Sequence, residues 1–493
     1  MTAEIPQQVT IDGTSLTIAE LSAIANQEAE LRLDDAAADA IGLAHARLVA
    51  ARDNGAVYGA NTGVGANRAV SVDSSAGEES SDAHARRLLR SHCAAVGEPE
   101  SAIVARATMI VRLNQIAAGR SGVSRQLADA LESAIATGSS PAIHGRGPIG
   151  TADLSPLAEL ALTLAGELPW QSGGIPPARI ADTDALPFIS SSAMTVALAA
   201  LGSGELGAVL DGAAVVASLS FLALQGSPQA YDETVHGARS HPEQNDVAKR
   251  MRSLITSDSA GAATPARIQD PFGLRVVPQV HAPAIAALGR LATIVEAELN
   301  AGVENPMVTD AGIFHHGQFH LATLAAAVDH LRTSLVPVFA LSSARLGMLL
   351  RSDMSGLPPF LAAEQPGSSG MMIAEYLVQD LLAELRMLAT PTTGASVSIS
   401  LGVEDHASFA PQGGRALRRM AQPSSTVIAV EAVAAVRALR LAPERLGAAP
   451  ARGAFEFLAG ELNPEITDRP LGEDIERAKR LVPLLGGLVS DGL

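Results

Sequence analysis

A glycine-rich segment near the start of the chain presents one of only three tyrosines in the sequence. Residues 58–65 read YGANTGVG. These residue types favour loops, because glycine adopts conformations closed to other residues and short polar side chains bond their own backbone. Tyr58 is therefore a candidate for proton transfer, although a phenol, whose ordinary pKa is about 10, needs a positive field to act near neutral pH. A turn with a packing tyrosine is the alternative.

A second segment combines an amide, an aromatic ring and a guanidinium. Residues 269–275 read QDPFGLR, so Gln269, Phe272 and Arg275 recur every three residues. At about 3.6 residues per turn they would share one face of a helical turn, while the proline and glycine between them fit a loop equally well. Arg275 could hold a carboxylate through paired N–H donors. A structural salt bridge is the alternative interpretation.

Histidines and carboxylates cluster in two further places. His315, His316 and His320 lie close together in sequence, and 404–406 form a compact charged group, Glu-Asp-His, in a mainly uncharged region. A metal ion needs several ligands at suitable spacing, and no carboxylate accompanies the first group. We interpret those histidines as packing or hydrogen-bonded residues and expect no metal site. The second group stays open between structure and function.

Helical patterns must position these segments. Aromatic residues make up only 3% of the chain, while alanine and leucine are abundant. The long helix-like runs are 104–138, 195–225, 280–300, 317–351, 369–388 and 425–441. Several are apolar on all sides, which is typical of a bundle interior or a subunit interface. Glycine- and proline-rich stretches predict long loops at 58–65, 145–156, 171–187, 269–278 and 358–370. We therefore predict a mainly all-α protein.

Composition narrows the classes of function. The formal net charge of −17 disfavours nucleic acid, since an acidic protein repels the phosphate backbone. A single cysteine, Cys93, excludes a disulfide framework and suits a reducing cytoplasm. The N-terminus shows no secretory pattern, and the longest uncharged stretches, 185–204 and 212–231, contain prolines and serines. We expect a cytoplasmic protein without a membrane partner.

The motifs resemble one protein family along nearly the whole chain. The matching segments are 58–65, 91–97, 112–114, 119–123, 147–160, 241–242, 269–275, 278–279, 304–306, 319–320 and 404–406. Their order and spacing are similar to those of the aromatic amino acid ammonia-lyase family, which includes the histidine, phenylalanine and tyrosine ammonia-lyases. The pocket residues most resemble those of histidine ammonia-lyase.

The resemblance implies an ammonia-lyase/fumarase-like fold. A loop-rich N-terminal domain at 1–190 would precede a long central helical bundle and C-terminal helices at 191–493. The family forms homotetramers whose active sites take loops from more than one subunit. Its enzymes remove ammonia from an aromatic amino acid with the electrophile methylidene-imidazolone, which forms when an Ala-Ser-Gly tripeptide cyclises and loses two waters.

The resemblance also implies roles for individual residues. Tyr58 matches the catalytic base, and Arg275 matches the clamp that holds the substrate carboxylate. The other implied substrate-binding positions are His92, Ser190, Gln269, Phe272, Phe319 and Glu404. Of these, His92 and Glu404 match positions that face the imidazole in histidine-specific members, so a small-molecule carboxylate is the expected ligand.

The tripeptide is where the sequence departs most from the family. The pattern Gly-x-x-Gly-Ala-Ser-Gly-Asp-Leu aligns with residues 147–154, GPIGTADL. Only Thr151 and Ala152 stand where three residues should precede Asp153. With no serine to dehydrate and no glycine to cyclise, we expect this prosthetic-group site to be degenerate, with no methylidene-imidazolone and no other cofactor.

Other positions change in the same direction, since Ser190 and Phe272 stand where the family has Asn and Tyr. The leading hypothesis is a histidine-ammonia-lyase-like enzyme that performs acid/base elimination, conjugate addition or cyclisation on a small polar amino-acid-like carboxylate. A positioned acid or base supplies about 10²–10⁴-fold acceleration, so the substrate must already be activated. The alternatives are a non-catalytic binder of a small molecule or partner, and a conventional ammonia lyase whose tripeptide the sequence misrepresents.

Overall fold

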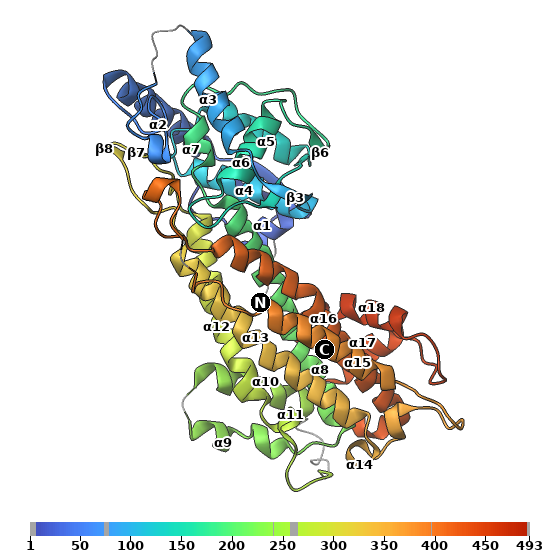
Figure 1. Ribbon diagram of the computed structural model, residues 1–493. Helices are drawn as coiled ribbons and strands as arrows, with labels where there is room; N and C mark the ends of the chain where they lie inside the picture. The colour runs from blue at the N-terminus through green and yellow to red at the C-terminus, as the bar shows by residue number, and fades with distance from the viewer. Residues whose placement is uncertain (1–5, 73–77, 240, 257–264, 396, 491–493) are drawn as a thin grey trace.

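Helices dominate the computed structural model, which describes residues 6–72, 78–239, 241–256, 265–395 and 397–490. Within these ranges the strands form four two-stranded sheets. A compact upper part, built mostly from the N-terminal elements, sits at one end of a bundle of long helices (Figure 1). The prediction of a mainly all-α protein with a central bundle of long helices is confirmed. The boundary placed at residue 190 stays a prediction.

The upper part is a helical cluster edged by short strands. Its helices are α1 (Ile18–Ala25), α2 (Asp35–Asn54), α3 (Glu78–His92), α4 (Ala102–Ala117), α5 (Arg125–Ala136), α6 (Leu154–Leu164) and α7 (Ala185–Ile189). Three sheets pair β1 (Gln8–Ile11) in parallel with β2 (Glu30–Leu33), β3 (Val96–Pro99) with antiparallel β5 (His144–Arg146), and β4 (Ser140–Pro141) with antiparallel β6 (Trp170–Ser172). Helix α4 is buried along nearly its whole length, so it forms the core of this part.

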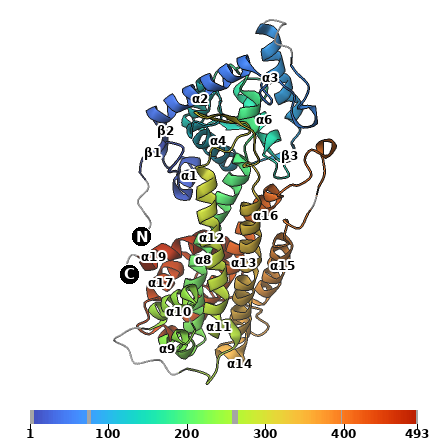
Figure 2. The ribbon, with the colours of Figure 1, turned by 90° about the vertical axis from the view of Figure 1, so that its left-hand side faces the viewer.

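The bundle is built around α8 (Ala193–Ala223), which packs along α16 (Ala410–Leu441), α12 (Val277–Leu299) and α4. Helix α13 (Ala322–Leu349) packs against α12 and α16, and α15 (Met372–Leu388) covers α13 and α16 from outside (Figure 2). Helix α8 consists mostly of alanine, glycine, serine and aliphatic residues and has no polar face, which explains its central position.

Shorter elements surround the bundle. They are α9 (Glu233–Gly237), α10 (Pro242–Ile255), α11 (Phe272–Arg275), α14 (Ser352–Ser355), α17 (Arg452–Glu461), α18 (Gly472–Leu481) and α19 (Leu485–Ser490). The antiparallel hairpin of β7 (Met307–Thr309) and β8 (Gly312–Phe314) interrupts the helices and reaches the upper part beside α2 (Figure 1). The hairpin therefore places residues from the second half of the chain beside the upper part.

Two predicted helix runs differ from the observed helices. The run 104–138 divides between α4 and α5, because Gly119 and Gly122 have φ angles of +68° and +79°, which end one helix and turn the chain before the next. The run 425–441 is the second half of α16, which continues through Pro423 to Ala410. Packing against α8 and α13 outweighs the local cost of that proline.

A buried ion pair joins the bundle helices far from the upper part. Arg345 on α13 donates to both carboxylate oxygens of Glu431 on α16, at 2.6 and 2.9 Å, and both side chains are fully buried. Ser220 on α8 donates to the same carboxylate at 2.6 Å. Because a buried charge without a partner is costly, this three-helix contact fixes the relative positions of α8, α13 and α16.

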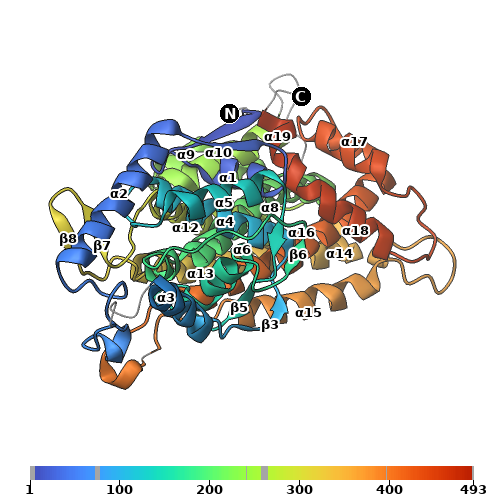
Figure 3. The same ribbon diagram turned by 90° about the horizontal axis from the view of Figure 1, so that it is seen from above.

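Some long helices leave apolar surface uncovered by their own chain. Three described helical stretches are long and apolar enough to cross a membrane by length and composition alone, namely 185–223, 277–299 and 322–349. The most apolar windows are buried over 78%, 39% and 56% of their residues respectively. On α15, which lies at the outer edge of the molecule (Figure 3), Ile373 and Tyr376 are 62% and 68% exposed. These faces are suited to contact with a further protein surface.

Candidate active site

A cavity of about 590 Å³ opens where the upper part meets the end of the bundle. Seven segments line it, and they come from both halves of the chain. The lining residues are Tyr58, Val64, Gly65, Ala66, Asn67, His92, Thr151, Leu154, Leu186, Ser190, Asn305, Gly317, Phe319, His320, Ser400, Val403, Glu404, Asp405 and His406. The structure thus brings together Tyr58, His92, Thr151, Ser190, Phe319 and Glu404 of the predicted site.

The Tyr58 loop is folded tightly enough to fix its phenol. The backbone N–H of Gly65 donates to the phenol oxygen of Tyr58 at 2.8 Å. The next residue, Gly59, has φ +73°, and a Cβ there would lie 2.2 Å from Leu186, so only glycine fits. The Tyr58 ring meets the His315 ring edge-on, with centroids 6.1 Å apart. The Gly65 N–H therefore fixes the position of the phenol oxygen at the cavity.

The degenerate tripeptide lies under the cavity in a strained, closely packed turn. Ala152 has φ +88°, an uncommon value for a residue with a side chain, and it is buried. Gly150 has φ +96°, and a Cβ there would lie 2.0 Å from the Ser408 hydroxyl. The hydroxyl of Ser408 donates to the Gly150 carbonyl at 3.2 Å. The turn is therefore held by its surroundings rather than by its own conformational preference.

Asp153 anchors this turn to the start of α8. Its carboxylate accepts from the backbone N–H of Thr195 at 2.7 Å and from the Thr195 hydroxyl at 2.8 Å, and its own N–H donates to the Ser191 carbonyl at 2.7 Å. Burial raises the pKa of the Asp153 carboxyl to about 6, and the bonds from Thr195 and the charge of Arg415 oppose the rise without cancelling it. Asp153 is thus a structural cap beneath the cavity.

The residues of the turn do not fit methylidene-imidazolone. That group needs a hydroxyl on the middle residue, and Ala152 has only a methyl group. It also needs a free amide nitrogen on the following residue to attack the carbonyl two residues back. The corresponding nitrogen, that of Asp153, is committed to Ser191 at 2.7 Å.

A buried ion pair supports the opposite wall of the cavity. Arg112 on α4 and Glu304 are buried and joined at 2.5 Å. Arg112 also donates to the carbonyls of Phe188 and Pro187 at 2.9 and 2.7 Å, so it fixes α7 in place. The next residue, Asn305, is a further cavity-lining residue that sequence reasoning did not assign, although the Glu-Asn-Pro segment belongs to the matching motifs.

Two segments supply polar side chains to the cavity, His92 at the end of α3 and the loop that carries Glu404. We call this the polar end of the cavity. The Nδ1 of His92 lies 2.8 Å from the Leu88 carbonyl oxygen and so carries the proton, which leaves Nε2 as an acceptor. Glu404 lies on a loop closed by the bond from the N–H of Ile399 to the Glu404 carbonyl, at 2.8 Å. The Ser400 hydroxyl on that loop accepts from the N–H of Ala66 at 3.1 Å. The Glu404 loop and the Tyr58 loop are thereby joined directly.

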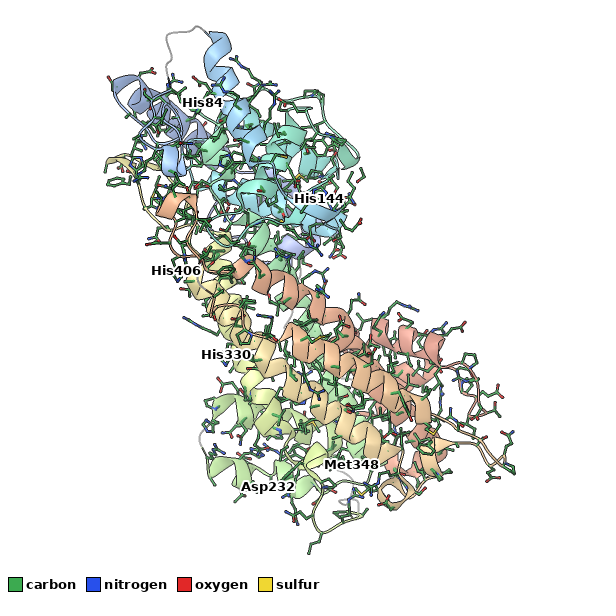
Figure 4. The ribbon with its side chains drawn as sticks, in the orientation of Figure 1. His84, His144, Asp232, His330, Met348 and His406 are labelled. Carbon is green, nitrogen blue, oxygen red and sulfur yellow. The ribbon has the colours of Figure 1, made fainter. Side chains whose placement is uncertain are left out.

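Gln269, Phe272 and Arg275 lie elsewhere. Helix α11 is at the far end of the bundle from the cavity (Figure 1). Its Gly273 packs against Met348, where an added Cβ would lie 2.6 Å from the methyl carbon, and Figure 4 shows Met348 far from His406 of the cavity. One chain therefore does not bring the expected carboxylate clamp to Tyr58.

Arg275 is nevertheless available for a ligand. Its guanidinium lies 4.5 Å from the centre of the Phe272 ring, and Phe272 is 63% exposed. Its Nε is buried without a hydrogen-bond partner among the residues that the structure describes. A guanidinium stacked on an aromatic ring keeps its planar donors in a fixed orientation, as paired recognition of a carboxylate requires.

Metal binding finds no support in the geometry. Across the described ranges, no group of three or more histidine, cysteine, aspartate or glutamate residues is arranged to hold a metal ion. His320 and His406 approach each other in the cavity, while His316 turns away and accepts from the N–H of Gln318 at 3.0 Å. The clustered histidines of the sequence therefore separate into different environments.

Comparison with known proteins places the chain in a family. The family described as aromatic amino acid lyase matches residues 16–458. Histidine ammonia-lyase of Salmonella typhimurium is 32% identical over 496 residues, covering 96% of this chain and 97% of that protein. The chain belongs to the aromatic amino acid lyase family.

Solved structures show the same architecture. Histidine ammonia-lyase from Trypanosoma cruzi matches with a TM-score of 0.88 and 26% identity, over 98% of this chain and 95% of that one. The ergothioneine-degrading enzyme ergothionase from Treponema denticola matches with a TM-score of 0.88 and 24% identity, over 97% of this chain and 99% of that one. Both likenesses extend over nearly the full length of the fold.

Proposed function

We propose that this protein is a histidine-ammonia-lyase-like enzyme that works without methylidene-imidazolone. It performs acid/base elimination, or the related conjugate addition or cyclisation, on a small polar amino-acid-like carboxylate. The observation that carries the proposal is the turn at 151–153, whose middle residue lacks a hydroxyl and whose following amide nitrogen is already bonded, while Tyr58 and the polar residues of the cavity persist. The enzyme therefore has a base and a binding site but no electrophile.

The proposed chemistry follows from what Tyr58 can do alone. Its phenolate takes a proton from the carbon next to the one bearing the leaving group, and the N–H of Gly65 fixes the position of its oxygen. A base of this kind contributes about 10²–10⁴-fold acceleration. An ordinary amino group leaves too poorly for that contribution to suffice, so the substrate carries a better leaving group or an existing double bond.

The polar end of the cavity favours an imidazole-bearing substrate. His92 offers an acceptor nitrogen and Glu404 a carboxylate, and both line the cavity with Tyr58. The name of ergothionase, an ergothioneine-degrading enzyme, makes a histidine betaine a suitable substrate class to test here. A quaternary ammonium group stays cationic and leaves as a neutral amine, so it needs no electrophile.

The complete site requires more than one copy of the chain. Arg275 is the carboxylate clamp in our proposal, and it lies at the far end of the bundle, where its Nε finds no partner within the described part of the chain. The uncovered apolar faces of α12 and α15 support a homotetramer in which the α11 end of one subunit reaches the cavity of another. We place the assembly in the cytoplasm and propose no nucleic-acid or membrane partner, since the apolar helices serve subunit contacts.

Two alternative functions can be distinguished from the proposed one by experiment. A non-catalytic protein would use the same cavity only to bind its ligand. A conventional ammonia lyase would require an Ala-Ser-Gly tripeptide that the sequence does not contain.

Turnover of imidazole-bearing probes tests the proposal. The wild type and Tyr58→Phe are incubated with histidine betaine, ergothioneine and L-histidine, and the conjugated product is followed by its ultraviolet absorbance. We expect turnover of a betaine by the wild type, a loss of about 10²-fold or more in Tyr58→Phe, and no deamination of L-histidine. Equal turnover by both proteins would remove Tyr58 from the mechanism. Probe binding without any product would favour the non-catalytic protein.

A further inference from the structure

We propose that His406 is a second proton-transfer group of the cavity, held in its working orientation by His320. The two residues are 86 positions apart in sequence, and the fold brings them together at the mouth of the bundle. The Nε2 of His320 lies 3.0 Å from the Nδ1 of His406, and the ring centres are 5.1 Å apart. This inference rests on the proposed function and extends it.

The pairing leaves Nε2 of His406 free to contact a ligand. A hydrogen bond between two imidazoles needs one N–H donor and one bare nitrogen, so the pair shares a single proton between Nε2 of His320 and Nδ1 of His406. Both rings line the cavity, with His320 half-buried and His406 exposed to it. The remaining nitrogen of His406, Nε2, is therefore the end of the pair that can meet a ligand.

The electrostatics decide which ring takes an added proton. Burial lowers the pKa of His320, and the nearby His406 lowers it further, while a bond of the His320 ring to its own backbone opposes the shift. The His320 ring is therefore the poorer site for an added proton. His320 then accepts from Nδ1–H of His406, and the added proton goes to Nε2 of His406. His320 is the positioning residue and His406 the acid.

Other titratable groups face the same space. They are Tyr58 from the glycine-rich loop, His92 from the end of α3, and Glu404 and Asp405 from the loop that carries His406. The two carboxylates favour the charged imidazolium, whereas a protonated His92 would oppose it. Tyr58 is the only base among them that the proposed function uses, so the second proton transfer is otherwise unassigned.

An acid at this place has a definite chemical use. When Tyr58 removes the proton, the C–H electron pair forms the double bond and the bond to the leaving group breaks. A group that leaves as a neutral amine needs no proton. A hydroxyl leaves only if a proton joins its oxygen, and Nε2–H of His406 can supply that proton to give water. His406 therefore extends the substrate class to groups that depart as anions.

Two probes that give the same product separate these cases. Histidine betaine loses a neutral amine, and imidazole lactate loses water, and both yield the same conjugated acid. We expect His406→Gln to lower kcat on imidazole lactate by about 10²–10⁴-fold with little change in KM, and to lower kcat on the betaine by less than about 10-fold. His330→Gln, an exposed histidine on α13 away from the cavity (Figure 4), is the matched control and leaves both unchanged. Equal losses on the two probes, or none, would overturn the proposal.

A second measurement needs no turnover. The rate at which diethyl pyrocarbonate modifies His406 is followed against pH by peptide mass spectrometry, with His330 as the internal reference. We expect the apparent pKa of His406 to fall by about one unit in His320→Phe and to be largely restored in His320→Asn, whose amide oxygen can accept the same bond. An unchanged pKa in His320→Phe overturns the pairing and the proposal with it. A shifted pKa with neither probe turned over supports the pairing and counts against the proposed function instead.

Discussion

Tyr58 and Arg275 lie at opposite ends of the helical bundle, the first at the cavity and the second on α11 (Figure 1). A small carboxylate cannot contact both within a single subunit. Arg275 stacks on Phe272 and keeps a buried nitrogen that no described residue bonds, as expected of a group that binds a ligand. The separation therefore has a direct consequence for how the active site is assembled.

Mixed oligomers test whether the site is shared. We expect Tyr58→Phe and Arg275→Gln each to inactivate the proposed homotetramer, because the first removes the proposed base and the second the proposed clamp. Co-expressed in one cell, they form some sites that contain both intact residues, so we expect activity well above that of either variant alone. Turnover of the betaine by the purified mixed oligomer is the measurement.

The control for that experiment mixes the two variants after each has assembled separately. We expect no recovery there unless subunits exchange. Failure of the co-expressed oligomer to exceed its parents, with the mixed assembly verified by differently tagged subunits, would show that both residues act within one chain or that Arg275 does not serve this site.

Asp153 makes a specific prediction about pH and stability. Its pKa is raised to about 6 by burial, so the folded protein holds the proton more tightly than the unfolded chain does. The associated stability is present below about pH 4 and is lost as the pH rises through about 6. The free energy of unfolding of the wild type, relative to Asp153→Asn, should therefore fall by about 3 kcal/mol between pH 4 and pH 8.

Thermal or denaturant unfolding of the two proteins across this pH range measures the difference. Other titrating groups are common to both proteins and cancel in the comparison. Parallel curves for the wild type and Asp153→Asn would mean that the Asp153 carboxyl titrates normally, and the buried cap described for α8 would then be wrong.

The buried ion pair of Arg112 and Glu304 is expected to contribute strongly to the stability of the protein. Glu304→Ala leaves a fully buried guanidinium without its counter-charge, which costs about 3–5 kcal/mol of unfolding free energy. Asp353→Ala removes the exposed partner of Arg351 and should leave the unfolding temperature unchanged. Calorimetry on both variants checks the contrast, and a Glu304→Ala protein as stable as the Asp353→Ala protein would refute it.

Sequence patterns predicted the helices well where packing and local preference agree. The run 195–225 corresponds closely to α8, because an apolar, small-residue segment is helical and central at once. The start of α16 was missed, since Pro423 and a pair of glycines oppose a helix locally and only contacts with α8 and α13 sustain it. Local patterns cannot register a cost that distant packing offsets.

Local sequence patterns were also insufficient to predict how the site residues come together. Tyr58, His92 and Glu404 were identified through the resemblance, and the structure places all three on one cavity. The pairing of His320 with His406 could not be predicted from the spacing of either motif, because it depends on how two separate loops meet. The position of Arg275 could not be foreseen for one chain, since in the proposed assembly its motif belongs to a site shared between subunits.

The absence of methylidene-imidazolone is the central claim, and peptide mass spectrometry tests it most directly. Trypsin releases residues 147–179 as one peptide, which contains the whole degenerate turn. We predict that this peptide, from protein purified without denaturing its turn beforehand, has the mass of the unmodified sequence, and that the intact protein shows no added near-ultraviolet absorption. A peptide lighter by two water molecules would contradict the account and restore a conventional ammonia lyase.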